Sequence, residues 1–284
     1  MSPSTVTLPS LADVGALALD VDGTLAGADH AVSPRAAAAV ARVRDAGVPV
    51  LLVTGRSRAN ALALAGSIGV DLPVVCCNGA VVVDPRTDED LRVETLPERE
   101  VRTMAELADE LDLTCTWWTS RDIFISEPGF GRDLLMALNE QDVQIADLGD
   151  TDPASIVKIM IVGRGERLDE VAPTVSRIPR IARAMDEFFE LSPERGAKWE
   201  GLSFVLDRLG VSADRTLGLG DGGNDVPWLS RIGYALAMGN ARPEVKAVTL
   251  ASIGHHAEDG LAAFLEHALD HLGLGARTTT GDLP

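Results

Sequence analysis

The residues Gly15 to Leu25, GALALDVDGTL, combine a short apolar run with an acidic turn. An apolar run that ends in a glycine turn is typical of a buried β-strand. Asp20 and Asp22 stand two positions apart at its end, so both side chains leave the same edge of the strand. Gly23 permits the tight turn that follows. The stretch therefore predicts a buried strand whose carboxyl end carries two carboxylates.

A second acidic turn of the same construction lies near the other end of the chain. The apolar run from Thr216 to Leu219 leads into the turn 220–225, GDGGND, which carries Asp221 and Asp225. Open α/β sheets bind their ligands at the carboxyl ends of strands. Close carboxylates repel each other, and a bound cation relieves that repulsion. Because Mg²⁺ prefers hard oxygen ligands, the two turns predict a magnesium-dependent catalytic site built from both ends of the chain.

Helix and strand patterns alternate after the first turn. Ser33 is a candidate helix N-cap and Gly47 a candidate helix end. The next predicted elements are a strand, a helix and a strand, over residues 48–53, 57–66 and 73–77. This alternation implies an α/β fold with a parallel sheet and right-handed crossovers.

The pattern changes after Asp84-Pro85. Residues 84–191 mix predicted hairpins, such as 114–126, with amphipathic helices, which favours a separate α+β domain. The α/β pattern returns at Ser192. We therefore predict a Rossmann-like core formed by residues 1–83 and 192–284, interrupted by an inserted cap domain over residues 84–191.

Composition limits the classes of partner. The chain has 25 basic and 43 acidic residues, a net charge of −18, which argues against binding to nucleic acid or an anionic membrane surface. A small anionic substrate stays possible, because a metal and a few cations can reverse the potential locally. The three cysteines, Cys76, Cys77 and Cys115, lack metal-ligand spacing and are expected to be buried reduced thiols.

Localisation follows from what the chain lacks. The first ten residues have neither the basic segment nor the apolar core of a secretory signal. No apolar stretch approaches the roughly 20 residues that a membrane span needs. We expect a cytoplasmic enzyme.

Polar residues at other element ends add to the predicted site. Thr54 and Gly55 follow a buried strand and precede a helix, where a hydroxyl and free amides suit a phosphate. Arg56 could pair with a further anion oxygen, the alternative being a solvated surface position. Lys198 could neutralise phosphate charge where the core resumes, although a lone lysine is more often solvated.

The two carboxylates of the first acidic turn suit different catalytic roles. A buried carboxylate such as Asp20 can attack phosphorus and form an aspartyl-phosphate. Its neighbour Asp22 could protonate the leaving oxygen and then activate water. The simpler alternatives are an aspartate that only caps a turn, and a glycine-rich turn at 220–225 that caps the following helix.

Together these motifs resemble the haloacid dehalogenase-like (HAD) superfamily. The resemblance rests on DVDGTL, the TGR after the second strand, CNGA after the third, a lysine after the insertion, and GDGGND followed by AMGNA. Their order and the large insertion are similar to Cof-type phosphatases of subfamily IIB, which carry a C2-type cap. The resemblance covers the whole predicted core.

The resemblance implies a role for each site residue. Asp20 would be the nucleophile and Asp22 the general acid/base, with Mg²⁺ held by the Asp20 carboxylate, the Asp22 main-chain carbonyl and Asp221. The implied phosphate ligands are the Val21 main chain, Thr54, Gly55, Lys198 and Asn224. Asp225 would orient the lysine or a metal-bound water, and the turn Asn78-Gly79 would line the approach to the site.

Two departures from the family pattern are visible. Trp228 stands where family members often have Met, and residues 252–258, with paired histidines, are less typical. Neither involves an implied ligand, so we expect them to affect packing or specificity.

The expected activity is Mg²⁺-dependent hydrolysis of a small phosphomonoester, such as a sugar phosphate or a phosphorylated cofactor. A phosphomutase or phosphotransferase with the same intermediate is the nearest alternative, and a catalytically silent ligand-binding protein is another. The cap is the expected specificity element. Alternation places Trp117 and Trp118 on opposite faces of a cap strand, with packing the favoured role for both. The substrate and the oligomeric state stay open.

Overall fold

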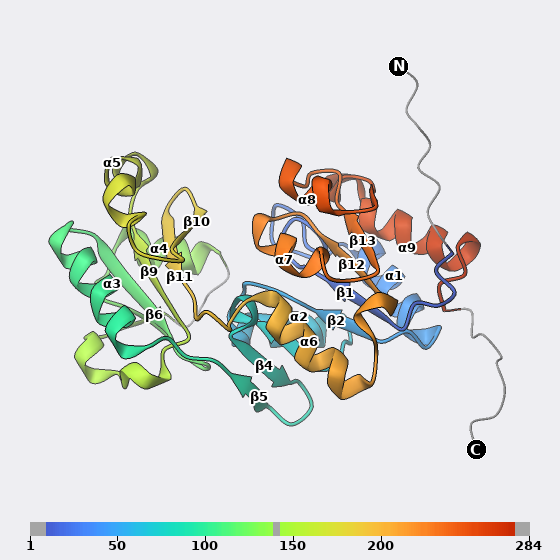
Figure 1. The fold of residues 1–284 in the computed structure, drawn as a ribbon, viewed down its shortest axis with the longest axis horizontal. Helices are drawn as coiled ribbons and strands as arrows, with labels where there is room; N and C mark the ends of the chain where they lie inside the picture. The colour runs from blue at the N-terminus through green and yellow to red at the C-terminus, as the bar shows by residue number, and fades with distance from the viewer. Residues whose placement is uncertain (1–9, 139–142, 276–284) are drawn as a thin grey trace. The chain divides into compact units, whose positions relative to one another are not determined.

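A parallel sheet provides the frame for the acidic turns. In the computed structural model, which describes residues 10–138 and 143–275, five strands pair in the order β14-β13-β12-β1-β2 (Figure 1). All the pairings within this sheet are parallel, as the alternating pattern predicted. The strands are β1 (Ala16–Leu19), β2 (Val50–Leu52), β12 (Thr216–Gly220), β13 (Tyr234–Ala237) and β14 (Ala251–Ser252).

The interior strand β1, which pairs with β12 and β2, is apolar along its whole length because it is covered on both faces. All four of its residues are buried. Its last residue, Leu19, lies opposite Leu219 of β12 and Leu52 of β2. The residues that follow these strands therefore leave the sheet at the same edge.

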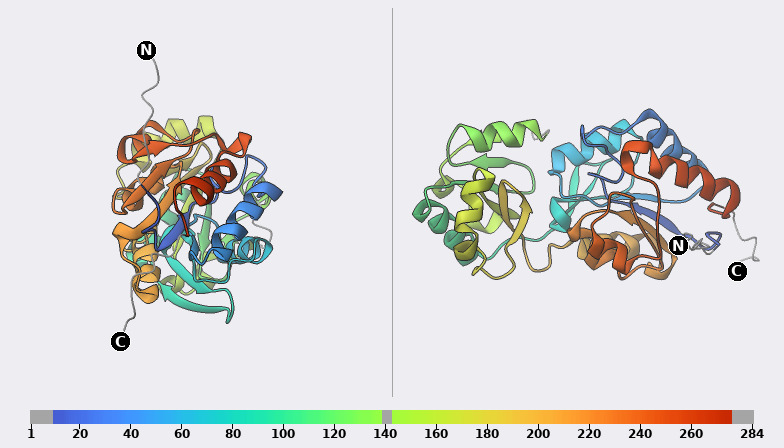
Figure 2. Two further views of the ribbon diagram at one scale, coloured as in Figure 1. Left: turned by 90° about the vertical axis from the view of Figure 1, so that its right-hand side faces the viewer. Right: turned by 90° about the horizontal axis from the view of Figure 1, so that it is seen from above.

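Helices α1 (Pro34–Asp45) and α9 (Gly260–His271) lie side by side against this sheet (Figure 2). Their exposed sides are joined by the ion pair Arg35–Glu266 at 2.6 Å. The predicted N-cap is confirmed, since the Ser33 hydroxyl accepts a hydrogen bond from the Ala36 amide at 3.0 Å. The other helices around the sheet are α2 (Arg58–Ser67), α6 (Lys198–Leu209), α7 (Val226–Leu229) and α8 (Pro243–Val248).

The inserted segment has its own sheet and its own core. Its described strands pair in the order β10-β11-β9-β6-β7-β8, and helices α3 (Glu98–Glu110) and α5 (Gly165–Val175) contribute to a cluster of buried side chains around Trp117. The strands are β6 (Thr114–Trp118), β7 (Ile123–Ile125), β8 (Val143–Ile145), β9 (Lys158–Val162), β10 (Ala182–Met185) and β11 (Phe188–Leu191). The predicted 114–126 hairpin is confirmed, whereas α4 (Phe130–Ala137) and β8 were not predicted.

The strand predicted over residues 73–77 does not belong to the parallel sheet. It is β3 (Val74–Cys76), which lies in a separate small sheet with β4 (Val81–Asp84) and β5 (Glu89–Val93). The φ angles of Cys77, Asn78 and Gly79 are 50°, 57° and 104°, so the chain turns sharply after β3 and enters β4. This turn, which the apolar pattern does not encode, makes the predicted placement of the strand wrong.

The chain divides into two compact units. One contains residues 1–54, 64–74 and 202–284, and the other contains residues 55–63 and 75–201. The predicted domain limits at residues 84 and 191 remain a prediction, because this division groups β3 to β5 and the start of α6 with the inserted segment. Among the described helices, none is both long and apolar enough to cross a lipid bilayer. The secretory-signal interpretation concerns residues 1–10, of which only Ser10 lies within the described residues.

Candidate active site

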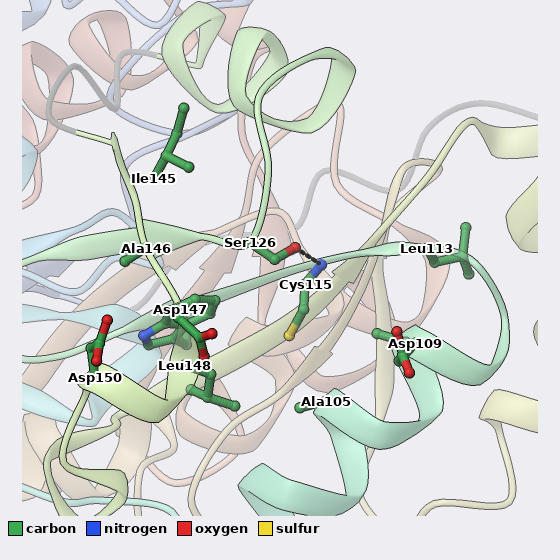
Figure 3. Close-up of a pocket in the computed structure, with 12 residues that line it drawn as sticks. Ala105, Asp109, Leu113, Cys115, Ser126, Ile145, Ala146, Asp147, Leu148 and Asp150 are labelled. Atoms are coloured by element: carbon green, nitrogen blue, oxygen red, sulfur yellow. Dashed lines mark hydrogen bonds between the residues drawn. The ribbon is translucent and has the colours of Figure 1, made fainter.

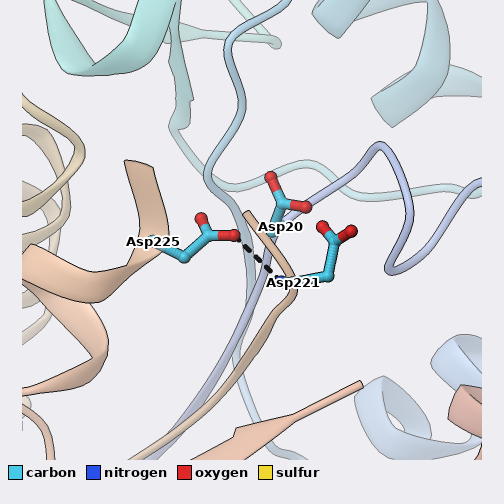
Figure 4. A group of neighbouring side chains, drawn as sticks. All are labelled: Asp20, Asp221 and Asp225. Atoms are coloured by element: carbon cyan, nitrogen blue, oxygen red, sulfur yellow. Dashed lines mark hydrogen bonds between the residues drawn. The ribbon is translucent and has the colours of Figure 1, made fainter. Parts of the chain in front are cut away.

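The two acidic turns meet at the carboxyl edge of the parallel sheet. Carboxylate oxygens of Asp20, Asp221 and Asp225 all lie within 4.8 Å of one another (Figure 4). The Asp20 amide donates to the Leu219 carbonyl at 3.0 Å, which continues the β1–β12 pairing into the turns. The register of two adjacent parallel strands thus brings together aspartates that are far apart in the chain.

Gly23 is required for this close approach. It has a φ of 80°, and a Cβ atom at this position would overlap the Asp221 carboxylate. Any larger residue would therefore separate the first acidic turn from the second.

The three carboxylates form a donor set that suits a hard cation. Asp20 and Asp225 are buried and Asp221 is half-buried, so their mutual repulsion is poorly screened by water. A divalent cation would offset that repulsion, and carboxylate oxygens are the ligand class that Mg²⁺ prefers. The chemistry of the cluster therefore fits Mg²⁺.

Asp225 is engaged by its own loop. Its Oδ2 accepts hydrogen bonds from the Asp221 and Gly222 amides, both at 3.0 Å, and its Oδ1 accepts from the Trp228 indole at 2.9 Å. These bonds fix the turn that carries Asp221. Asp225 is thus suited to support the loop, and Asp20 and Asp221 are the carboxylates better suited to hold a cation.

Trp228, the first departure from the family pattern, has a clear place in this arrangement. Its ring is fully buried, and a Cβ atom on Gly218 of β12 would overlap it. The glycine in the strand therefore makes room for the indole that bonds Asp225. The departure affects packing, as expected, and it also fixes a carboxylate of the cluster.

Asn240 is a site residue that the sequence motifs did not predict. Its amide nitrogen donates to Asp221 Oδ2 at 3.1 Å and to the Gly23 carbonyl at 2.8 Å. Its Oδ1 accepts from the His256 amide at 3.1 Å, which ties the atypical 252–258 segment to the site. Asn240 therefore joins both acidic turns. Asn240 belongs to the AMGNA motif, but that motif alone does not predict a contact with Asp221.

Asp22 differs from the cluster in its exposure. Its side chain is 42% exposed, and its Oδ1 lies 3.0 Å from His30 Nδ1. His30 has a φ of 59° and follows the turn without belonging to a recognisable motif, so it was not predicted. A carboxyl group that is open to solvent on one side and hydrogen-bonded on the other suits proton transfer to a substrate and to water.

The predicted phosphate ligands of the first unit follow the strand ends. Thr54 is buried just beyond β2, after Val53, whose amide donates to the Leu19 carbonyl at 2.9 Å. The Val21 carbonyl accepts from the Ala26 amide at 2.8 Å within the first acidic turn. Asn224 lies exposed in the short 3₁₀ turn 223–225.

The predicted site residues of the second unit are also ordered by local contacts. Lys198 begins α6 with only 2% of its surface exposed, so the solvated alternative is wrong for this lysine. Arg56 is buried too, and its Nη1 donates to Asn60 Oδ1 at 2.9 Å, so a surface position is wrong for it as well. A Cβ atom at Gly79 would overlap the Ala197 carbonyl, which shows how closely the turn after β3 approaches the start of α6.

A profile of the haloacid dehalogenase-like hydrolases matches residues 17–265 of the sequence. The chain belongs to this family. The HMP-PP phosphatase of Escherichia coli O157:H7 is 27% identical over 89% of this chain and 95% of its own length. The phosphoglycolate phosphatase of Methanopyrus kandleri is 25% identical over 89% of this chain and 96% of its own.

Solved structures extend the likeness to the fold. A HAD subclass IIB sugar phosphatase has a TM-score of 0.77 and 23% identity, covering 89% of this chain and 98% of its own. The recognition of the superfamily and the α/β fold with an added cap are confirmed. This haloacid dehalogenase-like hydrolase is a phosphatase, as the motifs predicted.

A cavity of about 630 Å³ lies within the inserted segment of this hydrolase (Figure 3). Among the described residues that line it, none belongs to the predicted site. Cys115 lies in its wall, and burial raises the pKa of this thiol to about 12, so it is protonated at neutral pH. Trp117 stacks on Phe124 and donates to Thr151 Oγ1 at 2.9 Å, which confirms a packing role for that indole.

Proposed function

We propose that this phosphatase hydrolyses a small phosphomonoester in a Mg²⁺-dependent reaction, through an aspartyl-phosphate on Asp20. The observation that carries the proposal is the cluster of Asp20, Asp221 and Asp225 at the carboxyl edge of the sheet. The named relatives act on small phosphorylated compounds, which supports a substrate of that class. A sugar phosphate or a phosphorylated cofactor fits this class, and we propose a cytoplasmic location for the enzyme.

The proposed chemistry has two steps. Asp20 attacks phosphorus in line, the bond from phosphorus to the ester oxygen breaks, and Asp22 gives its proton to the leaving alcohol. Asp22 then removes a proton from water, which attacks the aspartyl-phosphate and releases inorganic phosphate and free Asp20. Mg²⁺ held by the carboxylates of Asp20 and Asp221 and the Asp22 carbonyl would supply neutralisation of the phosphoryl charge.

Further residues of the chain bind and orient the phosphoryl group in this proposal. The Val21 main chain, Thr54, Gly55, Lys198 and Asn224 are its ligands, with Arg56, Asn78 and Asp225 in support. The burial of Lys198 supports this role, because water screens the charge of a buried ammonium only weakly, which strengthens its attraction to a nearby anion. We propose that the inserted segment, residues 84–191, closes over the leaving group and sets specificity.

A screen of phosphate release over a library of phosphorylated metabolites tests the function. With Mg²⁺ present, at least one ester is expected to release phosphate, and chelation of the metal should stop the release until Mg²⁺ is restored. Hexose monophosphates are followed for isomerisation as well, since an isomerised product without free phosphate would indicate a mutase. An absence of Mg²⁺-dependent release over the whole library would contradict the proposal.

Replacement of Asn240 is expected to lower the affinity of the enzyme for Mg²⁺. Asn240→Ala should raise the Mg²⁺ concentration for half-maximal activity by about 10- to 100-fold, the usual effect of losing a hydrogen bond to a metal ligand. The reason is that the Asp221 carboxylate loses a donor at 3.1 Å. Calorimetric titration with Mg²⁺ provides a readout that does not depend on turnover.

Lys246→Met is the matched control for this variant. Lys246 Nζ donates to the carbonyl of Gly239, the neighbour of Asn240, at 2.7 Å, so the change perturbs the same loop through its backbone. Its Mg²⁺ requirement should match that of the wild type. Equal Mg²⁺ requirements for Asn240→Ala and the wild type would show that Asn240 does not orient Asp221.

A further inference from the structure

Lys158 and Glu190 form a buried ion pair in the second unit. Lys158 lies in β9 with 2% of its surface exposed, and Glu190 lies in β11 with 8% exposed. Lys158 Nζ lies 3.1 Å from Glu190 Oε2. Removing both charges from water is unfavourable unless other groups also form hydrogen bonds with them. The catalytic steps proposed above do not use this pair, so its retention in the interior requires another reason.

The remaining hydrogen-bonding capacity of the pair is directed at two turns. Lys158 Nζ donates to the Gly55 carbonyl at 3.3 Å and lies 4.3 Å from the centre of the Trp118 ring. Glu190 Oε1 accepts from Asn78 Nδ2 at 2.7 Å and from Ser192 Oγ at 2.8 Å. Burial acts to raise the pKa of Glu190, but Lys158, Ser192 and Asn78 together hold it below its ordinary value. The carboxylate therefore stays charged at neutral pH.

Gly55 and Asn78 also contact each other. A Cβ atom on Gly55 would come within 2.8 Å of Asn78 Oδ1, and the Cys77 amide donates to the Arg56 carbonyl at 2.8 Å. The Gly55-Arg56 peptide is planar, so a hydrogen bond that fixes the Gly55 carbonyl also fixes the Arg56 N–H, on the C-terminal side of the proposed phosphate ligand Gly55. The ion pair thus determines the orientation of this peptide through Lys158 and of the Asn78 amide through Glu190.

We propose that Lys158 and Glu190 are positioning residues for phosphate binding. They hold the Gly55 peptide and the Asn78 side chain in the arrangement that receives the phosphoryl group. This inference rests on the proposed role of Gly55 as a phosphate ligand. Because β9 and β11 belong to the inserted segment, that segment shapes the phosphate-binding turn in addition to any contact with the leaving group.

Lys158→Met tests the proposal with inorganic phosphate as the ligand. Methionine keeps most of the side-chain volume and removes the donor to Gly55 and Glu190. We expect the dissociation constant of phosphate, measured by calorimetry with saturating Mg²⁺, to rise by about tenfold or more, the usual effect of losing one charge-assisted hydrogen bond. With an ester that the wild type hydrolyses, kcat/KM should fall by a similar factor. The conservative variant Lys158→Arg should restore part of the phosphate affinity and part of kcat/KM.

Two further variants separate positioning from stability. Ile159→Ala changes the next residue of β9, whose side chain lies in the cap core, and should lower the melting temperature without changing phosphate affinity. The double variant Lys158→Met/Glu190→Gln leaves no unpaired buried charge, so it should fold even if the single variant does not. It should still bind phosphate weakly, because the donor to the Gly55 carbonyl is absent.

The outcomes distinguish this inference from the function on which it rests. If the wild type releases no phosphate from any ester and does not bind phosphate, the proposed function fails and the inference fails with it. If the wild type is active but the folded double variant binds phosphate as tightly as the wild type does, only the positioning role is overturned. A loss of phosphate affinity in Ile159→Ala equal to that in Lys158→Met would also overturn it, since stability alone would then explain both.

Discussion

Asp20→Asn is expected to abolish turnover, with kcat lower by about 10⁴- to 10⁶-fold, the range seen when a catalytic nucleophile is removed. An amide oxygen lacks the negative charge that attacks phosphorus, and the acyl phosphate cannot form on it. The substitution preserves shape at a side chain with 5% of its surface exposed, so the fold should persist. Its effect is therefore expected on chemistry and not on stability.

Rapid acid quench with phosphorus-labelled substrate measures the intermediate directly. Wild-type enzyme should carry acid-stable, alkali-labile label, and Asp20→Asn should carry none. Asp13→Asn is the matched control, because Asp13 is exposed just before β1 and lies outside the acidic cluster. Full label or full activity in Asp20→Asn would place the nucleophile elsewhere.

The parts of the fold that were predicted correctly depend on local signals. Three correct predictions each depend on only a few neighbouring residues. They are the Ser33 cap, the apolar run of β1 and the alternation that places Trp117 and Trp118 on opposite faces. Trp117 enters the cap core, while the Trp118 ring contacts the Lys158 ammonium. Each of these depends on the identity and spacing of neighbouring residues.

The parts that were missed depend on distant pairing or on unusual backbone angles. The placement of β3 follows from three consecutive positive φ angles at residues 77–79, and only the last of these residues is a glycine. A turn was predicted at Asn78-Gly79, but a positive φ at a residue such as Cys77 is uncommon, so the pairing of β3 with β4 in a separate sheet was not predicted.

In the candidate site, too, the residues in local motifs were predicted and the contacts set by distant pairing were not. The acidic turns were predicted because each carries its motif and strand together, and the register of β1 with β12 then brings them into contact. The ion pair of Lys158 with Glu190 was not predicted, because it is set by the register of β9 with β11. The contact of Asn240 with Asp221 likewise depends on loops that meet only in the folded chain.

Asp22→Asn is expected to lower turnover by about 10²- to 10⁴-fold, the usual contribution of general acid–base catalysis, without preventing attack by Asp20. The neutral amide can neither give a proton to the leaving oxygen nor take one from water. The loss of the acid matters only for an ester whose leaving group needs a proton, whereas the loss of the base slows the second step for every ester. An alkyl phosphate requires the proton in the first step, whereas p-nitrophenyl phosphate has a leaving group that departs without one.

Stopped-flow measurement with the two esters therefore separates the roles of Asp22. With p-nitrophenyl phosphate, Asp22→Asn should release a burst of p-nitrophenolate close to the enzyme concentration and then turn over slowly, because the aspartyl-phosphate accumulates. With an alkyl phosphate, both steps are slow and no burst should appear. The hydrogen bond at 3.0 Å to His30 can persist in the variant, so the position of the side chain is preserved. Equal losses for the two esters, with no burst from either, would show that Asp22 does not act as both acid and base.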